Sequence, residues 1–504
     1  MTLPTDLACD PSISPSSPID IMATPKRPTR IGFIPAHRGF FSASLAAEAR
    51  RQTISLMREL GVEVIVPSET QTEHGCVQDI RQAEVCADLF RSADVDGIVI
   101  GAMNFGDEQA VAHVVKSANL DVPIFLFGAQ ESQTLSLKMD RRDAFCGLLS
   151  IADALRQIGA RYLVGRRPIC SPAKDASFRT DLDEFFRACR VVKGIRRARY
   201  GQLGARPDAF WTCRFDERRL QRLGPTTVVL DLSEAIAGIG RMKDDEADVL
   251  RMVRELTEYA DCSSAPSASL VMIAKFELFL KRWIAEQALD GVAIQCWTSM
   301  QQNLGISSCA AMSRLSDQGF PAACEADILG TLSMHALHLA SDNPAALADW
   351  NNLHNEDDEL VNLWHCGVFP RSFASEKPRL TAHGILKSLP IIGEANSFGT
   401  IEFEAKPGPV TLLRIAQDNA DATKALVVEG QFEENSAHTF GSYGWCRIHR
   451  LQQLYRDVLL QHFPHHVAVV QSHVANPLKN ALGKFLGIQV FSDVNSGLSE
   501  IGRT

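Results

Sequence analysis

The chain has 504 residues, of which 45% are hydrophobic and 22% are charged, and its formal net charge is −9. This composition is typical of a globular protein, and the length allows about two to four domains. Because the net charge is negative and no basic run is interleaved with aromatic residues, the sequence argues against nucleic acids and anionic membrane surfaces as partners.

Residues 1–28 are rich in Pro, Ser and Asp, which predicts a disordered N-terminal extension and not a signal peptide. Strands and helices then alternate through 29–166, which predicts a doubly wound parallel sheet. The expected strands are 30–35, 62–66, 97–101 and 122–127, and the expected helices are 44–60, 78–92 and 108–118. No Gly-x-Gly-x-x-Gly motif follows the first strand, so NAD is not expected.

A second doubly wound α/β domain is predicted for 167–343 and a β-rich domain for 344–504. The second domain is expected to contain helices 181–189, 244–259 and 267–289 and strands 227–232 and 291–296. Short β-like runs at 400–405, 408–416, 424–429 and 466–471 indicate a barrel-like C-terminal domain with a final helix near 475–486. The predicted fold class is therefore two α/β domains followed by a β-rich one.

The 13 cysteines are scattered and form no CxxC pair. A chain of this length does not depend on disulfides for stability, so the pattern predicts reduced thiols and a cytoplasmic location. No apolar run reaches the roughly eighteen residues that a membrane span requires.

The first candidate for chemistry is Glu325, in the segment Gly319-Phe-Pro-Ala-Ala-Cys-Glu-Ala-Asp327. A carboxylate among small apolar neighbours is partly desolvated, which suits a metal ligand or a general base. The plainer interpretation is an acid near the N-terminus of the helix expected at 328–340, where the helix dipole favours negative charge. The segment taken alone favours this plainer interpretation.

Two further motifs follow. Ala348-Asp-Trp-Asn-Asn352 offers Asp349 as an oxygen ligand for a hard cation, although Asp and Asn are also common turn residues. Leu363-Trp-His-Cys-Gly-Val-Phe-Pro370 places His365 between apolar neighbours, where an imidazole is a ligand, a proton relay or a hydrogen-bonded core residue.

Two adjacent histidines open the strand expected at 466–471, in Phe463-Pro-His-His-Val-Ala-Val-Val470. Neighbouring side chains on a strand point to opposite faces, so one histidine can enter a site while the other does not. For both His465 and His466, a histidine at the surface or at the strand end is the alternative.

Taken together, these segments resemble the L-fucose isomerase family, with L-arabinose isomerase as a more distant relative, from about Arg30 to the C-terminus. The resemblance rests on Pro-Ala-Ala-Cys-Glu-Ala-Asp (321–327), Asp-Trp-Asn-Asn (349–352), Trp-His-Cys-Gly (364–367) and Pro-His-His-Val-Ala-Val-Val (464–470), which occur in the family's order. The separation of Glu325 from Asp349 is also similar to the spacing of the family's two acidic ligands.

The resemblance implies a metal-dependent aldose–ketose isomerase whose site forms where the second and third domains meet. Glu325, Asp349 and His466 would be the metal ligands, with His465 the less favoured histidine, and Glu325 and Asp349 would also be catalytic. The expected ion is Mn²⁺, with Mg²⁺ and Co²⁺ as alternatives. Three protein ligands leave coordination positions open for substrate, as a catalytic metal requires.

In the implied reaction, an open-chain sugar related to L-fucose, D-arabinose or L-arabinose chelates the metal through its carbonyl oxygen and the adjacent hydroxyl. One carboxylate moves a proton between C2 and C1 through an enediolate, and the other moves a proton between the two oxygens. A hydride shift is the alternative route, and exchange of substrate hydrogen with solvent distinguishes the two routes.

Five residues are candidate substrate contacts, with a solvated loop or core position as the alternative for each: Arg38, Gln295, Trp297, Asn352 and His365. The segment 101–108 lies at the carboxyl end of an expected parallel strand, where α/β sheets usually bind ligands. In the family this domain reaches toward a neighbouring subunit's site. A homo-oligomer is therefore expected, and the resemblance implies a hexamer.

Two other functions stay open on the sequence. One is an isomerase or epimerase of another sugar, such as a pentose, a tetrose or a modified deoxysugar. The other is a sugar-binding paralogue that keeps the fold without turnover, although the presence of both carboxylates and the imidazole argues against it. The chain is shorter than the fucose isomerases it resembles, and no motif identifies the residues that hold the distal carbons of the sugar.

Overall fold

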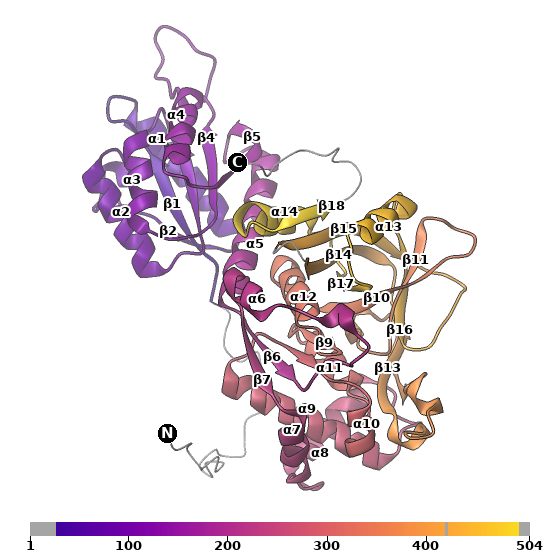
Figure 1. Ribbon diagram of the computed structural model, residues 1–504. Coiled ribbons are helices and arrows are strands. Elements are labelled where there is room, and N and C mark those ends of the chain that lie inside the picture. Colours follow the sequence, from indigo (N-terminus) through magenta and orange to yellow (C-terminus); the bar gives the residue numbers. More distant parts are fainter. Residues whose placement is uncertain (1–26, 419–421, 493–504) are drawn as a thin grey trace.

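The computed structural model describes residues 27–418 and 422–492. The predicted extension lies outside these residues except for its last two positions. Three sheets organise the described chain: a five-stranded parallel sheet, a four-stranded parallel sheet and a nine-stranded mixed sheet (Figure 1). The predicted fold class is confirmed. Within the described ranges, no helix has both the length and the apolar character needed to cross a membrane.

The N-terminal unit is a parallel sheet in the order β2-β1-β3-β4-β5 with helices on both faces. Its central strand β3 is buried along its whole length, as expected of a parallel strand covered on both sides. The strands are β1 (Arg30–Ala36), β2 (Glu63–Ile65), β3 (Gly97–Ala102), β4 (Ile124–Ala129) and β5 (Tyr162–Cys170), and the helices are α1 (Ala43–Glu59), α2 (Ile80–Ala93), α3 (Glu108–Ala118) and α4 (Ala144–Gln157). Strand β5 extends this sheet past the predicted boundary at residue 166.

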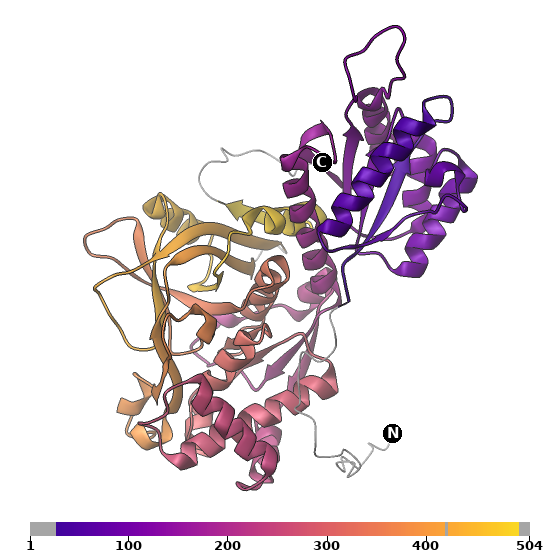
Figure 2. The same ribbon diagram turned by 180° about the vertical axis from the view of Figure 1, so that it is seen from behind.

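Helix α5 (Ala176–Arg197) is longer than the predicted helix 181–189 and joins the N-terminal unit to the rest of the chain. It begins at an Asp175 cap, whose side chain accepts a hydrogen bond from the Ser177 N–H, an arrangement typical of helix starts. The view from behind shows α5 running between the two parts of the molecule (Figure 2). Its C-terminal half packs against α12 (Ile328–Ser341), where Arg187 and Arg190 donate to the Ala340 and Leu339 carbonyls.

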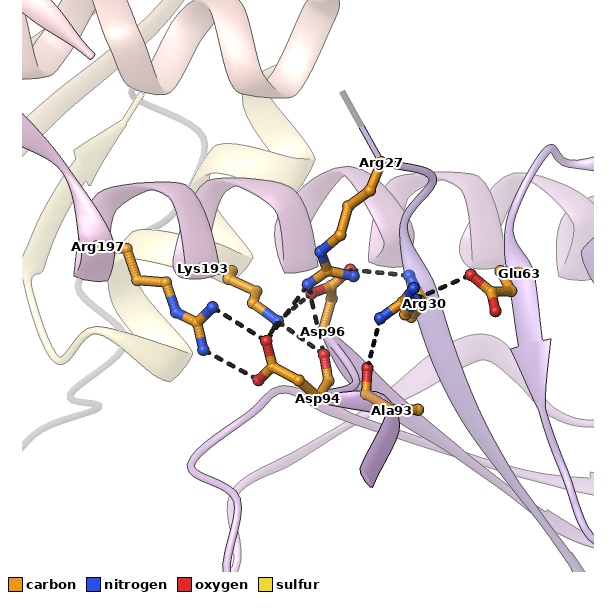
Figure 3. A network of polar contacts seen from close by, with 8 residues as sticks. All are labelled: Arg27, Arg30, Glu63, Ala93, Asp94, Asp96, Lys193 and Arg197. Atoms are coloured by element: carbon orange, nitrogen blue, oxygen red, sulfur yellow. Dashed lines mark hydrogen bonds and ion pairs between the residues drawn. The ribbon is translucent and has the colours of Figure 1, made fainter. Parts of the chain in front are cut away.

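A network of charged side chains fixes the end of α5 to the N-terminal sheet (Figure 3). Lys193 Nζ and Arg197 Nη2 lie 3.0 and 2.9 Å from the Asp94 carboxylate, and Arg27 Nη2 lies 2.7 Å from Asp96. A single exposed ion pair contributes little to stability, but a network of several charges orients its elements more firmly. The network therefore ties the C-terminal end of α5 to the segment that precedes β3, in addition to the apolar contacts of α5 with the N-terminal core.

The second unit is a parallel sheet in the order β7-β6-β8-β9. Its strands are β6 (Arg199–Leu203), β7 (Thr226–Leu230), β8 (Gly291–Ile294) and β9 (Ala322–Cys324). Its helices, besides α12, are α6 (Glu217–Leu223), α7 (Leu232–Gly240), α8 (Ala247–Tyr259), α9 (Ser267–Gln287), α10 (Ser299–Leu304) and α11 (Cys309–Asp317). The predicted long helices correspond to α8 and α9, whereas α10, α11 and β9 are too short to leave a clear periodic signal.

The third unit contains a closed barrel. Its sheet has the order β12-β13-β16-β11-β10-β17-β14-β15-β18, and β15 also pairs with β16, so the six strands from β16 to β15 close on themselves. The strands are β10 (Ala345–Leu353), β11 (Leu360–His365), β12 (Arg379–Ala382), β13 (Phe398–Glu404), β14 (Gly408–Gln417), β15 (Thr423–Glu433), β16 (Ser442–Arg447), β17 (His466–Val470) and β18 (Gln489–Ser492). Helices α13 (Leu451–Leu460) and α14 (Ala475–Lys479), the latter continued by a π-helical turn (Asn480–Phe485), lie beside it.

The second and third units share their hydrophobic cores. Along β10, Ala346 and Ala348 face a core that also contains residues of α7, α8 and α9, whereas Ala345 and Leu347 face a core that contains residues of α5 and α12. This alternation is the expected consequence of side chains pointing to opposite faces of a strand. The two units therefore form one body, and their junction lies inside it.

Candidate active site

Glu325 lies at the carboxyl end of β9, the end at which parallel sheets usually present functional side chains. Glu325 and Ala326 both have left-handed backbone angles, with φ of 62° and 55°, a strained conformation that recurs at functional sites. The Ala326 N–H donates to the Ile294 carbonyl at 3.0 Å and holds this turn against β8. The indole N–H of Trp297 donates to Glu325 Oε1 at 3.2 Å, so Trp297 orients this carboxylate.

Asp349 and His466 lie directly opposite one another on the antiparallel strands β10 and β17. Nε2 of His466 lies 3.5 Å from Asp349 Oδ1 and 3.1 Å from Glu325 Oε2. The structure thus brings together the three residues that the sequence suggested as metal ligands, at the junction of the second and third units.

The ring of His466 is held from behind by Asp327. Its Nδ1 lies 2.8 Å from Asp327 Oδ2, and Arg414 Nη1 lies 2.6 Å from the same oxygen. Burial would raise the pKa of Asp327, but the charge of Arg414 and the contact with His466 hold this pKa well below its usual value. The hydrogen of a neutral His466 is therefore on Nδ1, and Nε2 presents its lone pair to Glu325 and Asp349.

The residues around His466 also change its pKa. Burial alone would lower the pKa of His466, but the hydrogen bonds to Asp327, Cys213 and Glu325 outweigh burial and raise this pKa well above its usual value. A cation at Nε2 therefore competes with a proton.

When His466 is neutral and carries its hydrogen on Nδ1, three buried polar atoms around this cluster have no hydrogen-bond partner among the described residues: Glu325 Oε2, Asp349 Oδ1 and His365 Nε2. Leaving such atoms unpaired costs roughly 1–3 kcal/mol each, so they point to a ligand. By distance alone, potential ligand atoms of Glu325, His365 and His466 lie within 4.8 Å of one another, as do those of Asp349, His465 and His466. Two carboxylates and one imidazole fit a divalent cation such as Mn²⁺.

His365 presents a hydrogen and not a lone pair to the cluster. Its Nδ1 accepts the backbone N–H of Cys366 at 2.9 Å, so the neutral ring carries its hydrogen on Nε2. Burial would lower the pKa of His365, but Cys366, Asp349 and Glu325 raise it to about 9, and the charged ring also carries a hydrogen on Nε2. In either state His365 is a hydrogen-bond donor to whatever occupies the site.

His465 also approaches Asp349, with Nε2 3.7 Å from Oδ1. Its side chain is 44% exposed, whereas that of His466 is 1% exposed. Burial and the neighbouring charge of His466 lower the pKa of His465. The structure therefore distinguishes the two histidines: His466 is fixed in the interior and His465 lies at the rim.

The contacts recorded for the other three candidate substrate residues are with residues outside this cluster. The side chain of Gln295 accepts the Ala205 N–H at 2.8 Å and braces the loop after β6. Asn352 is exposed near the tip of the β10–β11 hairpin. Arg38 binds Gly106 O at 2.7 Å and the Glu108 carboxylate, both within the N-terminal unit. Substrate contact by these three residues stays a prediction.

Four residues at the site were given no role from the sequence. Asp327 stood in the recognised motif, but its role depends on Arg414, which comes from the distant strand β14. Cys213 lies 3.8 Å from His466 Nδ1, and Phe210 packs its ring against Trp297 with centroids 5.2 Å apart. Both come from the loop after β6, and no motif there marks them.

Comparison with known protein families identifies the class. Residues 32–196 match the model of the fucose/sulfoquinovose isomerase N-terminal domain, and residues 363–492 match that of the L-fucose isomerase C-terminal domain. The site residue His466 lies within the second matched region, and Glu325 and Asp349 lie between the two. The chain belongs to the L-fucose isomerase-like family of aldose–ketose isomerases.

Several curated relatives span most of the chain. It is 25% identical over 470 residues to a sulfoquinovose isomerase of Alkalicoccus urumqiensis, covering 91% of this chain and 98% of that protein. A sulfoquinovose isomerase of Priestia megaterium is 23% identical over 408 residues, which cover 80% of this chain and 85% of the relative. One from Clostridium sp. is 21% identical over 298 residues, covering 58% and 63%.

Proposed function

We propose that this protein is a divalent-metal-dependent isomerase that interconverts an aldose and its ketose, with sulfoquinovose as the first candidate substrate. The observation that carries the metal dependence is the convergence of Glu325 Oε2, Asp349 Oδ1 and His466 Nε2. The names of the relatives support the substrate, a 6-deoxyhexose that carries a sulfonate on C6. This chemistry falls within the modified deoxysugars that the sequence left open.

Glu325, Asp349 and His466 would hold the cation. When bound, a divalent cation supplies a Lewis acid that stabilises the negative charge developing on the C1 and C2 oxygens of the sugar. The orientation of the three residues is set in advance, because Trp297 holds Glu325 and Asp327 holds His466.

The carboxylate pair carries the proton transfers. One carboxylate removes the proton from C2 and returns it to C1, and the other moves the proton between the two oxygens, so that the aldose becomes the ketose with no net change in atoms. His365 donates from Nε2 to a sugar oxygen and stabilises its developing charge. Burial strengthens each of these interactions because the local dielectric constant is low.

L-Fucose and its pentose analogue D-arabinose are the second candidates, because the C-terminal model is described as that of L-fucose isomerase. These sugars lack the anionic group of sulfoquinovose. The two proposals therefore differ in whether the distal end of the substrate must be charged.

A substrate panel tests the proposal. The protein is incubated with Mn²⁺ and sulfoquinovose, D-glucose, L-fucose, D-arabinose or L-arabinose, and ketose formation is followed by NMR. D-glucose is the matched control because it differs from sulfoquinovose only at C6. We expect the highest kcat/KM with sulfoquinovose; preference for L-fucose would replace the substrate proposal, and no ketose from any sugar would overturn it.

A further inference from the structure

Two cysteines that are distant in the sequence meet beside His365. Cys309 begins α11 and Cys366 follows β11, and their Sγ atoms lie 3.8 Å apart. Nδ1 of His365 lies 3.2 Å from the sulfur of Cys366. The two thiols are therefore separated by one imidazole ring from Nε2, the nitrogen that His365 presents to the site.

The neighbours of Cys366 favour its thiolate form. The thiols of Cys309 and Cys324 hydrogen-bond to its sulfur and the charge of His365 lies beside it, and together these neighbours outweigh burial and lower the pKa of Cys366 well below its usual value. The contact has the opposite effect on Cys309, whose pKa is raised well above its usual value by Cys366 and then by burial. At neutral pH the pair therefore consists of one thiolate and one thiol.

A thiolate beside a second thiol is the arrangement required for reversible oxidation. The thiolate is the nucleophilic form of cysteine, and its oxidised product condenses with a neighbouring thiol to give a disulfide. The two sulfurs, now 3.8 Å apart, have to approach to about 2.05 Å. We propose that Cys366 and Cys309 form a redox site, at which a peroxide oxidises Cys366 and Cys309 then closes a disulfide with it.

The reaction balances with peroxide as the oxidant. The Cys366 thiolate attacks one peroxide oxygen, the O–O bond breaks and hydroxide leaves, which produces a sulfenic acid on Cys366. The Cys309 sulfur then attacks Cys366 Sγ, the S–O bond breaks, and the departing hydroxide takes the Cys309 proton to form water. Each sulfur gives up one electron and the peroxide gains two. The first step also removes the thiolate that keeps Cys309 protonated.

Cys309 is a better partner for this step than Cys324. The sulfurs of Cys324 and Cys366 lie within 4.8 Å of one another, but Cys324 is held in β9 by its pairing with Ile294 of β8. Cys309 is the first residue of α11, where a backbone N–H has no partner within the helix. Movement of Cys309 toward Cys366 therefore disturbs fewer hydrogen bonds.

Access to the pair is limited to small reagents. The exposed fractions of Cys366 and Cys309 are 8% and 2%, so neither sulfur is open to a bulky partner. A site that admits a sugar also admits hydrogen peroxide. The expected oxidant is therefore a small peroxide and not a larger molecule such as oxidised glutathione.

The disulfide would act on the site through His365. Its formation removes the thiolate beside Nδ1 and draws Cys366, the next residue in the chain, toward α11. His365 then loses both its charged partner and the position from which Nε2 donates. Peroxide should therefore lower kcat by about 10²-fold, the lower end of the cost of losing one donor to developing charge. This consequence rests on the proposed function.

Peptide mapping of the full chain tests the redox site. The protein is treated with hydrogen peroxide, its free thiols are alkylated, and its peptides are analysed by mass spectrometry without reduction. We expect a disulfide that joins the peptides of Cys309 and Cys366 and that disappears after treatment with dithiothreitol. A Cys366 thiol that remains free after peroxide would overturn the proposal, as would a disulfide between Cys324 and Cys366.

Variants of Cys309 separate the two steps. Cys309→Ser keeps an O–H donor for Cys366 but cannot close the disulfide, so Cys366 should stop at the sulfenic acid, which dimedone traps. Cys309→Ala, which introduces no buried hydroxyl, gives the same test if the serine variant fails to fold. Absence of the dimedone adduct on Cys366 in the folded variant would contradict the first step.

Two matched controls remove other thiols. Cys146→Ser removes an exposed thiol of α4, and Cys189→Ser removes a buried thiol of α5. Both variants should form the disulfide as the wild type does. Its loss in either control would assign the oxidation to a different pair of cysteines.

Activity is a separate readout. Dithiothreitol should restore the peroxide-treated wild type, whereas Cys309→Ser should lose part of its activity permanently, because an unresolved sulfenic acid is oxidised further to a sulfinic acid. Equal recovery of both proteins would overturn the role of Cys309. Peptide mapping does not depend on turnover, so failure of the isomerase proposal leaves its result intact, and a negative map leaves isomerisation intact.

Discussion

His466 and Asp327 lie 2.8 Å apart, Nδ1 to Oδ2, with each side chain 1% exposed. The same carboxylate faces the buried guanidinium of Arg414 and caps α12 through the Gly330 N–H. Because Arg414 keeps Asp327 ionised and Asp327 keeps the hydrogen of His466 on Nδ1, Nε2 is left for the site. One acid thus connects the stability of the core with the chemistry of the site.

Replacing Asp327 by Asn should lower both the stability of the fold and the affinity for the metal ion. Loss of the carboxylate that orients a metal-binding histidine lowers metal affinity by about 10- to 100-fold. It also leaves the charge of Arg414 unpaired in the interior, which costs about 3–5 kcal/mol of unfolding free energy. Calorimetric titration with Mn²⁺ and denaturant unfolding measure the two effects separately.

The double variant Asp327→Asn/Arg414→Met is the control for that experiment. It removes the unpaired charge as well, so most of the unfolding free energy should return while the Mn²⁺ affinity stays low. If the affinity recovered together with the stability, Asp327 would act on the fold alone and not on His466.

Glu325→Gln should nearly abolish turnover. The amide keeps the size of the side chain and an oxygen for the Trp297 N–H, but it removes a general base, which typically costs 10²- to 10⁴-fold in rate, and one charged ligand. We expect a fall of about this size in kcat and weaker Mn²⁺ binding, measured by ketose formation and calorimetry. Glu234→Gln on the exposed start of α7 is the matched control, and unchanged kcat in Glu325→Gln would contradict the proposed role.

Much of the fold was predictable because its elements carry strong periodic signals. The buried strands β3 and β4 and the long helices α8 and α9 agree with the predicted ranges to within a few residues. Closure of the barrel was not predictable in detail, since the pairing of β15 with β16 depends on strand curvature and leaves no local pattern.

The site was predictable only in part, because some of its contacts join residues far apart in the chain and leave no local sequence pattern. Glu325, Asp349 and His466 stand in recognisable segments, and their convergence follows the order of those segments. Arg414, in contrast, is a single charged residue in an otherwise apolar strand, and nothing in its neighbourhood indicates Asp327 as its partner.

Stability should fall in mild acid through His37. Burial, and then the charge of His74, lower the pKa of His37 below 6.5, so the folded protein resists its protonation. The unfolded chain binds more protons, and the unfolding free energy therefore falls as the pH drops from about 6.5 toward the folded pKa, by about 1.4 kcal/mol for each unit of pKa difference. Urea unfolding at about pH 7.5 and about pH 5.5 measures this loss.

His37→Gln should reduce that pH dependence, because the amide does not titrate. His113→Gln, on the surface of α3 in the same unit, is the control and should retain it. An equal loss of stability in wild type and His37→Gln would assign the acid sensitivity to other groups.

Substitutions of His365 and His466 should have different effects, because His365 presents a hydrogen-bond donor to the site and His466 presents a lone pair. The first should lower kcat, and the second should lower Mn²⁺ affinity. His365→Phe keeps a ring parallel to that of Trp364 but removes the Nε2–H, and loss of one donor to developing charge typically costs about 10²- to 10³-fold in kcat. Mn²⁺ affinity should stay close to that of the wild type. His466→Gln should instead lose Mn²⁺ binding.

The variant His365→Gln is the control, because an amide can donate a hydrogen bond and should therefore recover part of kcat. A loss of Mn²⁺ affinity in His365→Phe as large as that in His466→Gln would instead make His365 a metal ligand.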